Sequence, residues 1–167
     1  MAVSRLVRAE LDRHEWGALR CGCRGTAQHV PDIFRTVLEA EKAQDAVGIF
    51  LEGHLEVEGN LFEASVPAVG VILAALCGEL SDYARSQLLQ TLWVLSCGES
   101  HHSEVLHGRS RLGDECRLRA REGIWLVAAE GFGRNRELAA DILEVVDLNE
   151  DRASYYARTF PSKRRAK

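Results

Sequence analysis

Apolar side chains recur three or four positions apart along most of the chain, which is the spacing of one face of an α-helix. The pattern predicts helices over 32–40, 42–56, 65–80, 83–97, 114–130 and 134–148. No segment shows a sustained strict alternation of apolar and polar residues, so no strand is predicted. The chain is therefore expected to be all-α.

Two of these segments are alike. The stretches HVPDIFRTVL and SVPAVGVILAAL align through a Val-Pro pair, and Pro31 and Pro67 lie 36 positions apart. Each is followed by a second predicted helix, and 114–148 adds a third pair. A period of about 40 residues with two helices per unit is typical of HEAT and armadillo repeats. The sequence thus predicts a short right-handed α-solenoid of about three helix pairs, with capping helices before Trp16 and after Asn149.

Length and composition fit one domain. A chain of 167 residues with 46% apolar and 28% charged residues is long enough, and apolar enough, to bury a core. We expect residues 1–158 to form a single domain and the basic segment 159–167 to be a disordered tail.

The opening of the predicted solenoid resembles a known family. The stretch WGALRCGCRGTAQHVPDIFRTVL and the later FEASVP, residues 62–67, are similar to small bacterial HEAT-like repeat proteins, which combine Trp-x-x-Leu, a Gly/Ala turn and repeated Val-Pro helices. The resemblance covers about residues 16–148, although CGC stands where a Tyr-Gly type turn is usual. It implies a helical-repeat fold, and some members serve as immunity proteins against toxins.

Charge is distributed unevenly along the chain. Between Glu39 and Asp82 there are nine acidic residues and one base, Lys42. An acidic surface steers a basic partner toward it, so we predict a non-enzymatic protein-binding module. Together with this charge, the resemblance to the HEAT-like family implies an immunity or inhibitor protein that neutralises a partner toxin. The predicted partner-binding residues are Glu52, Glu56, Glu58, Glu63, His101, His102 and Glu104. Charged faces that serve only solubility are the alternative.

A second function is suggested by the later part of the chain. Residues 109–136 carry seven arginines and four acids, and the end RTFPSKRRAK is basic. These features would suit a HEAT-type nucleic-acid-binding or DNA-repair-like protein, which needs a basic concave face. The net charge of −4 and the acidic first units make nucleic acid the less favoured partner.

Two segments contain possible metal ligands. The connection 97–116 holds Cys97, His101, His102, Glu104, His107 and Cys116, but their spacing matches no closed zinc pattern and favours a solvated loop. Cys21, Cys23 and His29 include a C-x-C pair without a second pair, which favours two small residues beneath a turn. No metal or cofactor is therefore expected.

Catalytic chemistry is not indicated either. His54 could act as a base, yet no motif links a nucleophile to it, and a core histidine is favoured. Glu56, Glu58 and Glu63 are interpreted as solvated carboxylates rather than an acid/base pair. The protein is predicted not to be an enzyme, with a small-molecule ligand unlikely. It is expected to be cytoplasmic, because it has an odd number of cysteines, no signal-peptide pattern and no apolar run of spanning length.

Overall fold

A computed structural model describes residues 3–161; residues 1–2 and 162–167, which include most of the predicted tail, lie outside the described part. The described chain is mostly helical, which confirms the predicted class. Its helices are α1 (Arg5–Asp12), α2 (Val30–Glu39), α3 (Ser65–Leu76), α4 (Asp82–Cys97), α5 (His102–Leu106), α6 (Leu112–Arg121), α7 (Ile124–Glu130), α8 (Arg136–Val146) and α9 (Glu150–Thr159). Short 3₁₀ turns occur at Trp16–Ala18 and Ala43–Ala46.

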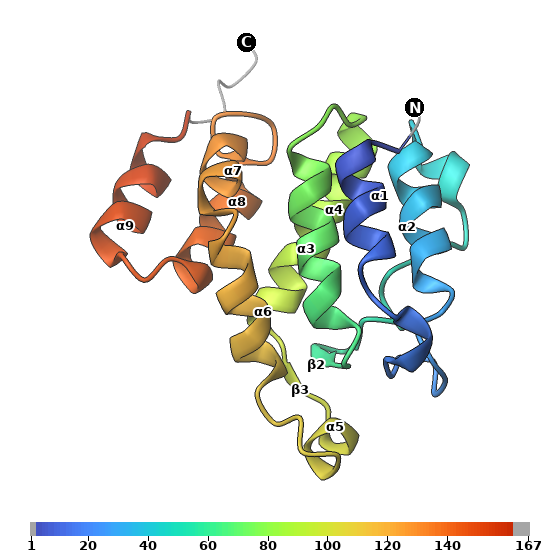
Figure 1. Ribbon diagram of the computed structural model, residues 1–167. Coiled ribbons are helices and arrows are strands. Elements are labelled where there is room, and N and C mark those ends of the chain that lie inside the picture. The colour runs from blue at the N-terminus through green and yellow to red at the C-terminus, as the bar shows by residue number, and fades with distance from the viewer. Residues whose placement is uncertain (1–2, 162–167) are drawn as a thin grey trace.

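The helices are arranged in a row that begins at α1 and α2 and ends at α9 (Figure 1). Helix α3 packs against α1, α4 and α6, while α4 packs against α2, α6 and α8. Helices α3 and α4 therefore lie at the centre of the row. At the far end of the row, α8 packs against α4, α7 and α9, and so connects the central helices to α9.

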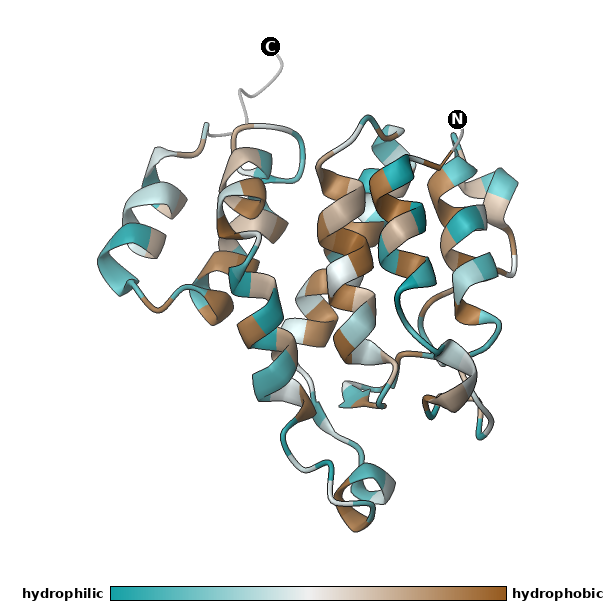
Figure 2. Ribbon diagram, viewed as in Figure 1, coloured by the Kyte–Doolittle hydropathy of each residue, from teal (hydrophilic) through white to brown (hydrophobic). Residues whose placement is uncertain are grey.

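Helix α3 forms the centre of the core. Most of its residues are apolar (Figure 2), and nine of its twelve residues are buried: Ser65, Pro67, Ala68, Val69, Val71, Ile72, Leu73, Ala75 and Leu76. A helix that is apolar all round is stable when other helices cover it on several sides. The contacts of α3 with three other helices meet this condition.

The predicted helix over 42–56 is wrong. The chain forms the 3₁₀ turn Ala43–Ala46 and then runs irregularly to residue 55. Gly48 and Gly53 have φ angles of +77° and +81°, which lie in the left-handed region and cannot continue a right-handed helix. The apolar periodicity was misleading because Leu51 and Leu55 are buried from a loop.

The prediction that the chain lacks strands is also wrong. Strands β1 (Glu56–Val57) and β2 (Asn60–Leu61) pair antiparallel, and β3 (Glu99–Ser100) adds to β2 in parallel. Glu58 and Gly59, with φ of 52° and 78°, form the two-residue turn between β1 and β2. Both central residues of a tight hairpin of this kind require positive φ. Strands of two residues are too short to produce a visible alternation.

The predicted helix over 114–130 is interrupted. Helix α6 ends at Arg121, and α7 begins at Ile124. Between them, Gly123 lies so close to Leu73 of α3 that an added Cβ would overlap its side chain. The break therefore coincides with the place where the chain touches the central helix.

The last helix extends slightly past the predicted domain end. Helix α9 reaches Thr159, and Phe160 after it is buried against Gly131. Among the described helices, none combines the length and the apolar character needed to cross a membrane.

Candidate functional site

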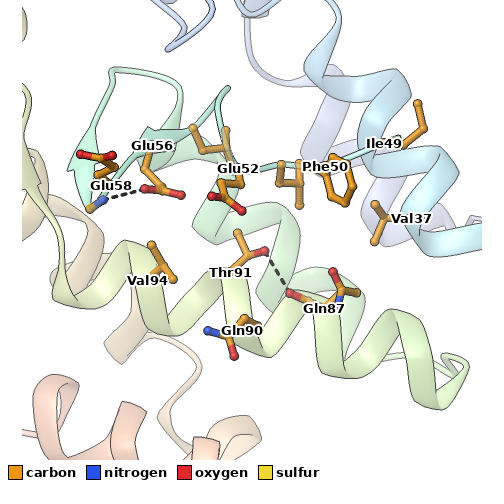
Figure 3. A pocket seen from close by; sticks show the side chains of 13 residues that line it. Val37, Ile49, Phe50, Glu52, Glu56, Glu58, Gln87, Gln90, Thr91 and Val94 are labelled. Carbon is orange, nitrogen blue, oxygen red and sulfur yellow. Dashed lines mark hydrogen bonds between the residues drawn. The ribbon is translucent and has the colours of Figure 1, made fainter. Parts of the chain in front are cut away.

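Three of the predicted partner-binding residues line one groove. Glu52, Glu56 and Glu58 lie on the irregular segment and hairpin that face α4, and the groove between them has a volume of about 330 Å³ (Figure 3). Its apolar lining includes Val37, Ile49, Phe50, Leu51, Leu55 and Val94, and its polar lining from α4 is Gln87, Gln90 and Thr91. The groove thus combines carboxylates with an apolar lining.

The three carboxylates differ in how firmly they are held. Glu56 is buried, and its carboxylate accepts a hydrogen bond of 2.7 Å from the Gly59 backbone N–H. Glu52 and Glu58 are exposed. Within residues 3–161, no cationic side chain forms an ion pair with any of these three glutamates, and no Lys, Arg or His lines the groove. The groove is therefore acidic and uncompensated.

Glu63 and Glu104, in contrast, are neutralised inside the protein. Glu104 has no exposed surface and accepts hydrogen bonds of 2.8–3.1 Å from Arg20. Glu63 pairs with Arg20 at 3.4 Å and with Arg109 at 2.7 Å. The hydrogen bond to Glu104 also raises the pKa of the Arg20 guanidinium. Glu104 offers no accessible atom to a partner.

His101 and His102 line a different cleft, of about 550 Å³, together with Arg20, Arg24 and Phe62. The His101 ring stacks on Phe62 with 4.8 Å between centroids, and its Nδ1 accepts from the Ser103 N–H at the start of α5. The predicted set is thus divided between an acidic groove and a cleft that contains cationic side chains.

Elsewhere the structure brings four potential metal ligands together. The donor atoms of Cys21, Cys23, His29 and His54 all lie within 4.8 Å of one another. His29 Nε2 and His54 Nδ1 are 2.8 Å apart, and the two Sγ atoms are 3.0 Å apart. Among the described residues this is the one group of three or more His, Cys, Asp or Glu close enough to share an ion. We call it the Cys/His cluster.

Backbone hydrogen bonds hold the two halves of the cluster together. The turn that carries Cys21 and Cys23 is closed by the Cys21 N–H donating to Gly25 O at 3.0 Å. Gly22 N–H donates to His54 O at 2.8 Å, which joins the turn directly to the distant histidine. A Cβ on Gly22 would lie 2.7 Å from Gly53 O, so only glycine permits this close approach.

Burial affects the ionisation of two cluster members. It raises the pKa of the Cys21 thiol to about 12, and the hydrogen bond from Cys23 adds to this effect. Burial also lowers the pKa of His54, as does the charge that His29 carries when protonated. Both effects favour the neutral imidazole of His54, which is the form that binds metals.

The connection 97–116, the other segment with possible metal ligands, does not form a metal-binding group. Cys97 is exposed, whereas Cys116 is buried inside α6, where burial raises its pKa to about 12. These thiols do not approach His101, His102 or His107 closely enough to form a metal-binding group with them.

Sequence reasoning missed His54 as a member of the Cys/His cluster. Cys21, Cys23 and His29 were considered together, but His54 was assigned to a helix that does not form. The signals that could have found it are Gly48 and Gly53, which argue against a helix in this segment.

Comparison with known proteins yields no relative: no family model matches the chain, and neither a curated protein nor a solved structure matches it significantly.

Proposed function

We propose that this protein is a non-enzymatic protein-binding module whose groove between residues 49–59 and α4 takes a basic segment of another protein. The observation that carries the proposal is the charge of the groove. Its three carboxylates have no compensating cation, although ion pairs neutralise several other acids of the described chain. The most specific version of this proposal is that the partner is a toxin and that the module covers its basic active surface.

The lining of the groove supports a peptide-like ligand. Phe50 is 58% exposed at its edge, and Leu51 and Leu55 form a buried apolar wall. An extended segment could place aliphatic or aromatic side chains here while its Lys or Arg side chains meet Glu52 and Glu58. The amides of Gln87 and Gln90 supply hydrogen-bonding groups on the opposite side.

The scaffold in this proposal is a short α-solenoid of HEAT-like pairs. The contacts of α3 with α1 and α6, and of α4 with α2 and α8, support it, since stacked repeats form two such layers. The groove lies on the side of α4 that the irregular segment 47–59 covers only in part.

A nucleic-acid-binding role is less well supported. The arginines of 109–136 are largely occupied: Arg109 pairs with Glu63 and Glu115, Arg117 with Glu99 and Asp114, and Arg121 donates to Val146 O. Arginines that are neutralised within the protein contribute little to counterion release from nucleic acid.

The groove can be tested with a defined probe. An extended peptide of alternating Lys and Leu, labelled for fluorescence anisotropy, should bind the wild-type chain more weakly as salt is raised. The double substitution Glu52→Lys and Glu58→Lys should weaken binding by about tenfold, because two exposed ion pairs of up to about 1 kcal/mol each are replaced by repulsion. Equal binding of an alternating Glu and Leu peptide would contradict the proposal.

The matched control reverses two exposed acids outside the groove. Glu79→Lys together with Glu144→Lys changes the net charge by the same amount without touching the lining. If this control weakens peptide binding as much as the groove variant does, general charge rather than the groove is responsible.

The toxin-neutralising form needs a biological readout. Co-expression with the product of a neighbouring open reading frame should restore growth if that product is the toxin. Restoration should be lost with Glu52→Lys/Glu58→Lys and retained with the control pair. If the neighbouring product is not toxic, the toxin-neutralising proposal loses its support. The peptide-binding experiment would still decide whether the groove binds a basic segment.

A further inference from the structure

The geometry points to a zinc site formed by the Cys/His cluster, with the two thiolates and two imidazoles as its four ligands. These residue types are the ones that zinc prefers, and a set of two cysteines and two histidines is a common structural combination. The donors come from two parts of the chain, the 21–29 segment and His54, so the ion would link them. The inference does not depend on the proposed binding function.

Three distances between a sulfur and a nitrogen donor fit a tetrahedral ion. Bonds of about 2.3 Å to sulfur and about 2.0–2.1 Å to nitrogen place tetrahedral S and N donors about 3.5 Å apart. The Cys21 Sγ atom is 3.7 Å from His29 Nε2 and 3.5 Å from His54 Nδ1, and Cys23 Sγ is 3.9 Å from His29 Nε2.

The two like pairs lie closer than an ion would hold them. Tetrahedral geometry expects about 3.8 Å between sulfurs and about 3.3 Å between nitrogens, against 3.0 Å and 2.8 Å here. Movements of less than about 1 Å, within the reach of small side-chain rotations, would open the cluster around an ion. Each thiol would release its proton to water as it binds.

A redox pair of cysteines explains less of the arrangement. A disulfide between Cys21 and Cys23 would use only the sulfurs and would leave the convergence of His29 and His54 on them unaccounted for. Both ring nitrogens face the sulfurs from different elements, His29 at the start of α2 and His54 from the loop before β1. A tetrahedral metal ion requires four donor atoms around one point, and these four side chains supply them.

The site is structural rather than catalytic, since four protein ligands leave no open position for water or substrate. The segment it would secure is the irregular one that replaces the predicted helix 42–56. Residues 47–55 of that segment form no helix or strand, and His54 follows Gly53, whose φ is +81°. The ion would thus stabilise a stretch that is irregular between the 3₁₀ turn and β1.

Cobalt(II) is a direct probe of the site. The full chain, reduced and freed of metal by a chelator that is then removed, should bind one equivalent of cobalt(II). Tetrahedral coordination by two thiolates should produce visible d–d bands and a near-ultraviolet charge-transfer band, and added zinc(II) should remove both. Zinc should also be present in protein purified without chelator, measured by elemental analysis.

Variants assign the ligands. Cys23→Ser and His54→Asn should abolish both bands; Cys23 is exposed, so its replacement leaves the core intact. Cys77→Ser and His107→Asn, a thiol and an imidazole outside the cluster that are both exposed, should leave them unchanged. Absence of the bands in the reduced wild-type chain would overturn the inference, as would bands that survive both ligand variants.

Proteolysis tests the structural role separately. A protease specific for glutamate should cut the metal-free chain faster at Glu52 and Glu58 than the zinc-loaded chain, because both residues lie on the segment that His54 anchors. Cleavage at Glu144, on α8, should be the same in both states. Equal rates at Glu52 and Glu58 with and without zinc would show that the ion does not secure this segment.

Discussion

Single carboxylates in this protein have very different surroundings, although the sequence presents them alike. Glu58 is exposed on a tight turn, Glu56 is buried with a backbone donor, and Glu104 is completely buried against Arg20. A buried charge without its partner is costly, whereas an exposed one is not. The effect of substituting each residue should therefore follow its surroundings rather than its type.

The Arg20–Glu104 pair should be sensitive to removal of the arginine. Arg20→Met would leave the buried Glu104 carboxylate without its three hydrogen bonds. We expect a loss of about 3 kcal/mol in the free energy of unfolding, the low end for a broken buried pair, because Arg20 is partly exposed. Urea unfolding followed by circular dichroism measures this loss.

The matched control is the exposed pair of Arg134 and Asp82, which lie 2.7 Å apart. Arg134→Met should change the unfolding free energy by less than about 1 kcal/mol. Similar losses for Arg20→Met and Arg134→Met would show that Glu104 is not held as the structure indicates.

At the scale of elements, close contacts determine where helices end. The apolar pattern predicts one helix over 114–130, and the chain forms α6 and α7 with Gly123 between them. Gly123 touches Leu73 at the middle of the core, where no side chain would fit. The break allows α7 to continue in a new direction and pack against α8.

Gly123→Ala should consequently destabilise the fold. Its Cβ would overlap the Leu73 side chain, and crowding of this kind costs about 1–3 kcal/mol, more than alanine regains by restricting the unfolded chain. Gly133→Ala is the control, because its Cβ would lie 3.4 Å from the nearest atom. In thermal unfolding the first variant should have the lower melting temperature.

A double-mutant cycle identifies the cause. If the overlap with Leu73 is responsible, Gly123→Ala should be less costly in a Leu73→Ala background. Additive effects of the two substitutions would instead point to the backbone of the α6–α7 junction.

The predictability of each element follows from its length and surroundings. Helices α3, α4 and α8 are long and rich in apolar residues. The sequence predicts both ends of α4 and α8 to within two residues, and it predicts the start of α3 but places its end four residues too late. The segment 42–56 has the same apolar spacing but contains Gly48 and Gly53, and only its tertiary contacts decide that it is a loop. The Cys/His cluster depends on this loop. Its three early members are visible in the sequence, while His54 joins them through a fold that local pattern does not reveal.

At the scale of the whole molecule, helix α9 forms one end of the row of helices (Figure 1). Helix α9 packs on α8, and its Arg152 and Tyr156 contact Trp125 of α7. Within residues 3–161, no helix lies on its other side (Figure 1). In an array of this kind, terminal elements open at lower free energy than central ones. The start of α9 is held by the Asn149 side chain, which accepts a hydrogen bond from the Arg152 N–H, and by the pair of Asp147 with Arg152, which form hydrogen bonds of 2.6 Å and 2.7 Å.

This pair should make stability depend on pH. The hydrogen bonds from Arg152 lower the pKa of the Asp147 carboxyl, so folding favours its charged form. The stabilisation is therefore complete above the carboxyl's unfolded pKa of about 3.9 and is lost as the pH falls through the lower folded pKa.

Asp147→Asn should reduce the unfolding free energy at about pH 7 and should shrink its decline between about pH 5 and pH 2. Glu144→Gln, at an exposed position of α8, should alter neither quantity. Urea titrations across this range measure both. An unchanged pH dependence in Asp147→Asn would mean that other carboxylates, and not the anchor of α9, govern the acid sensitivity of the protein.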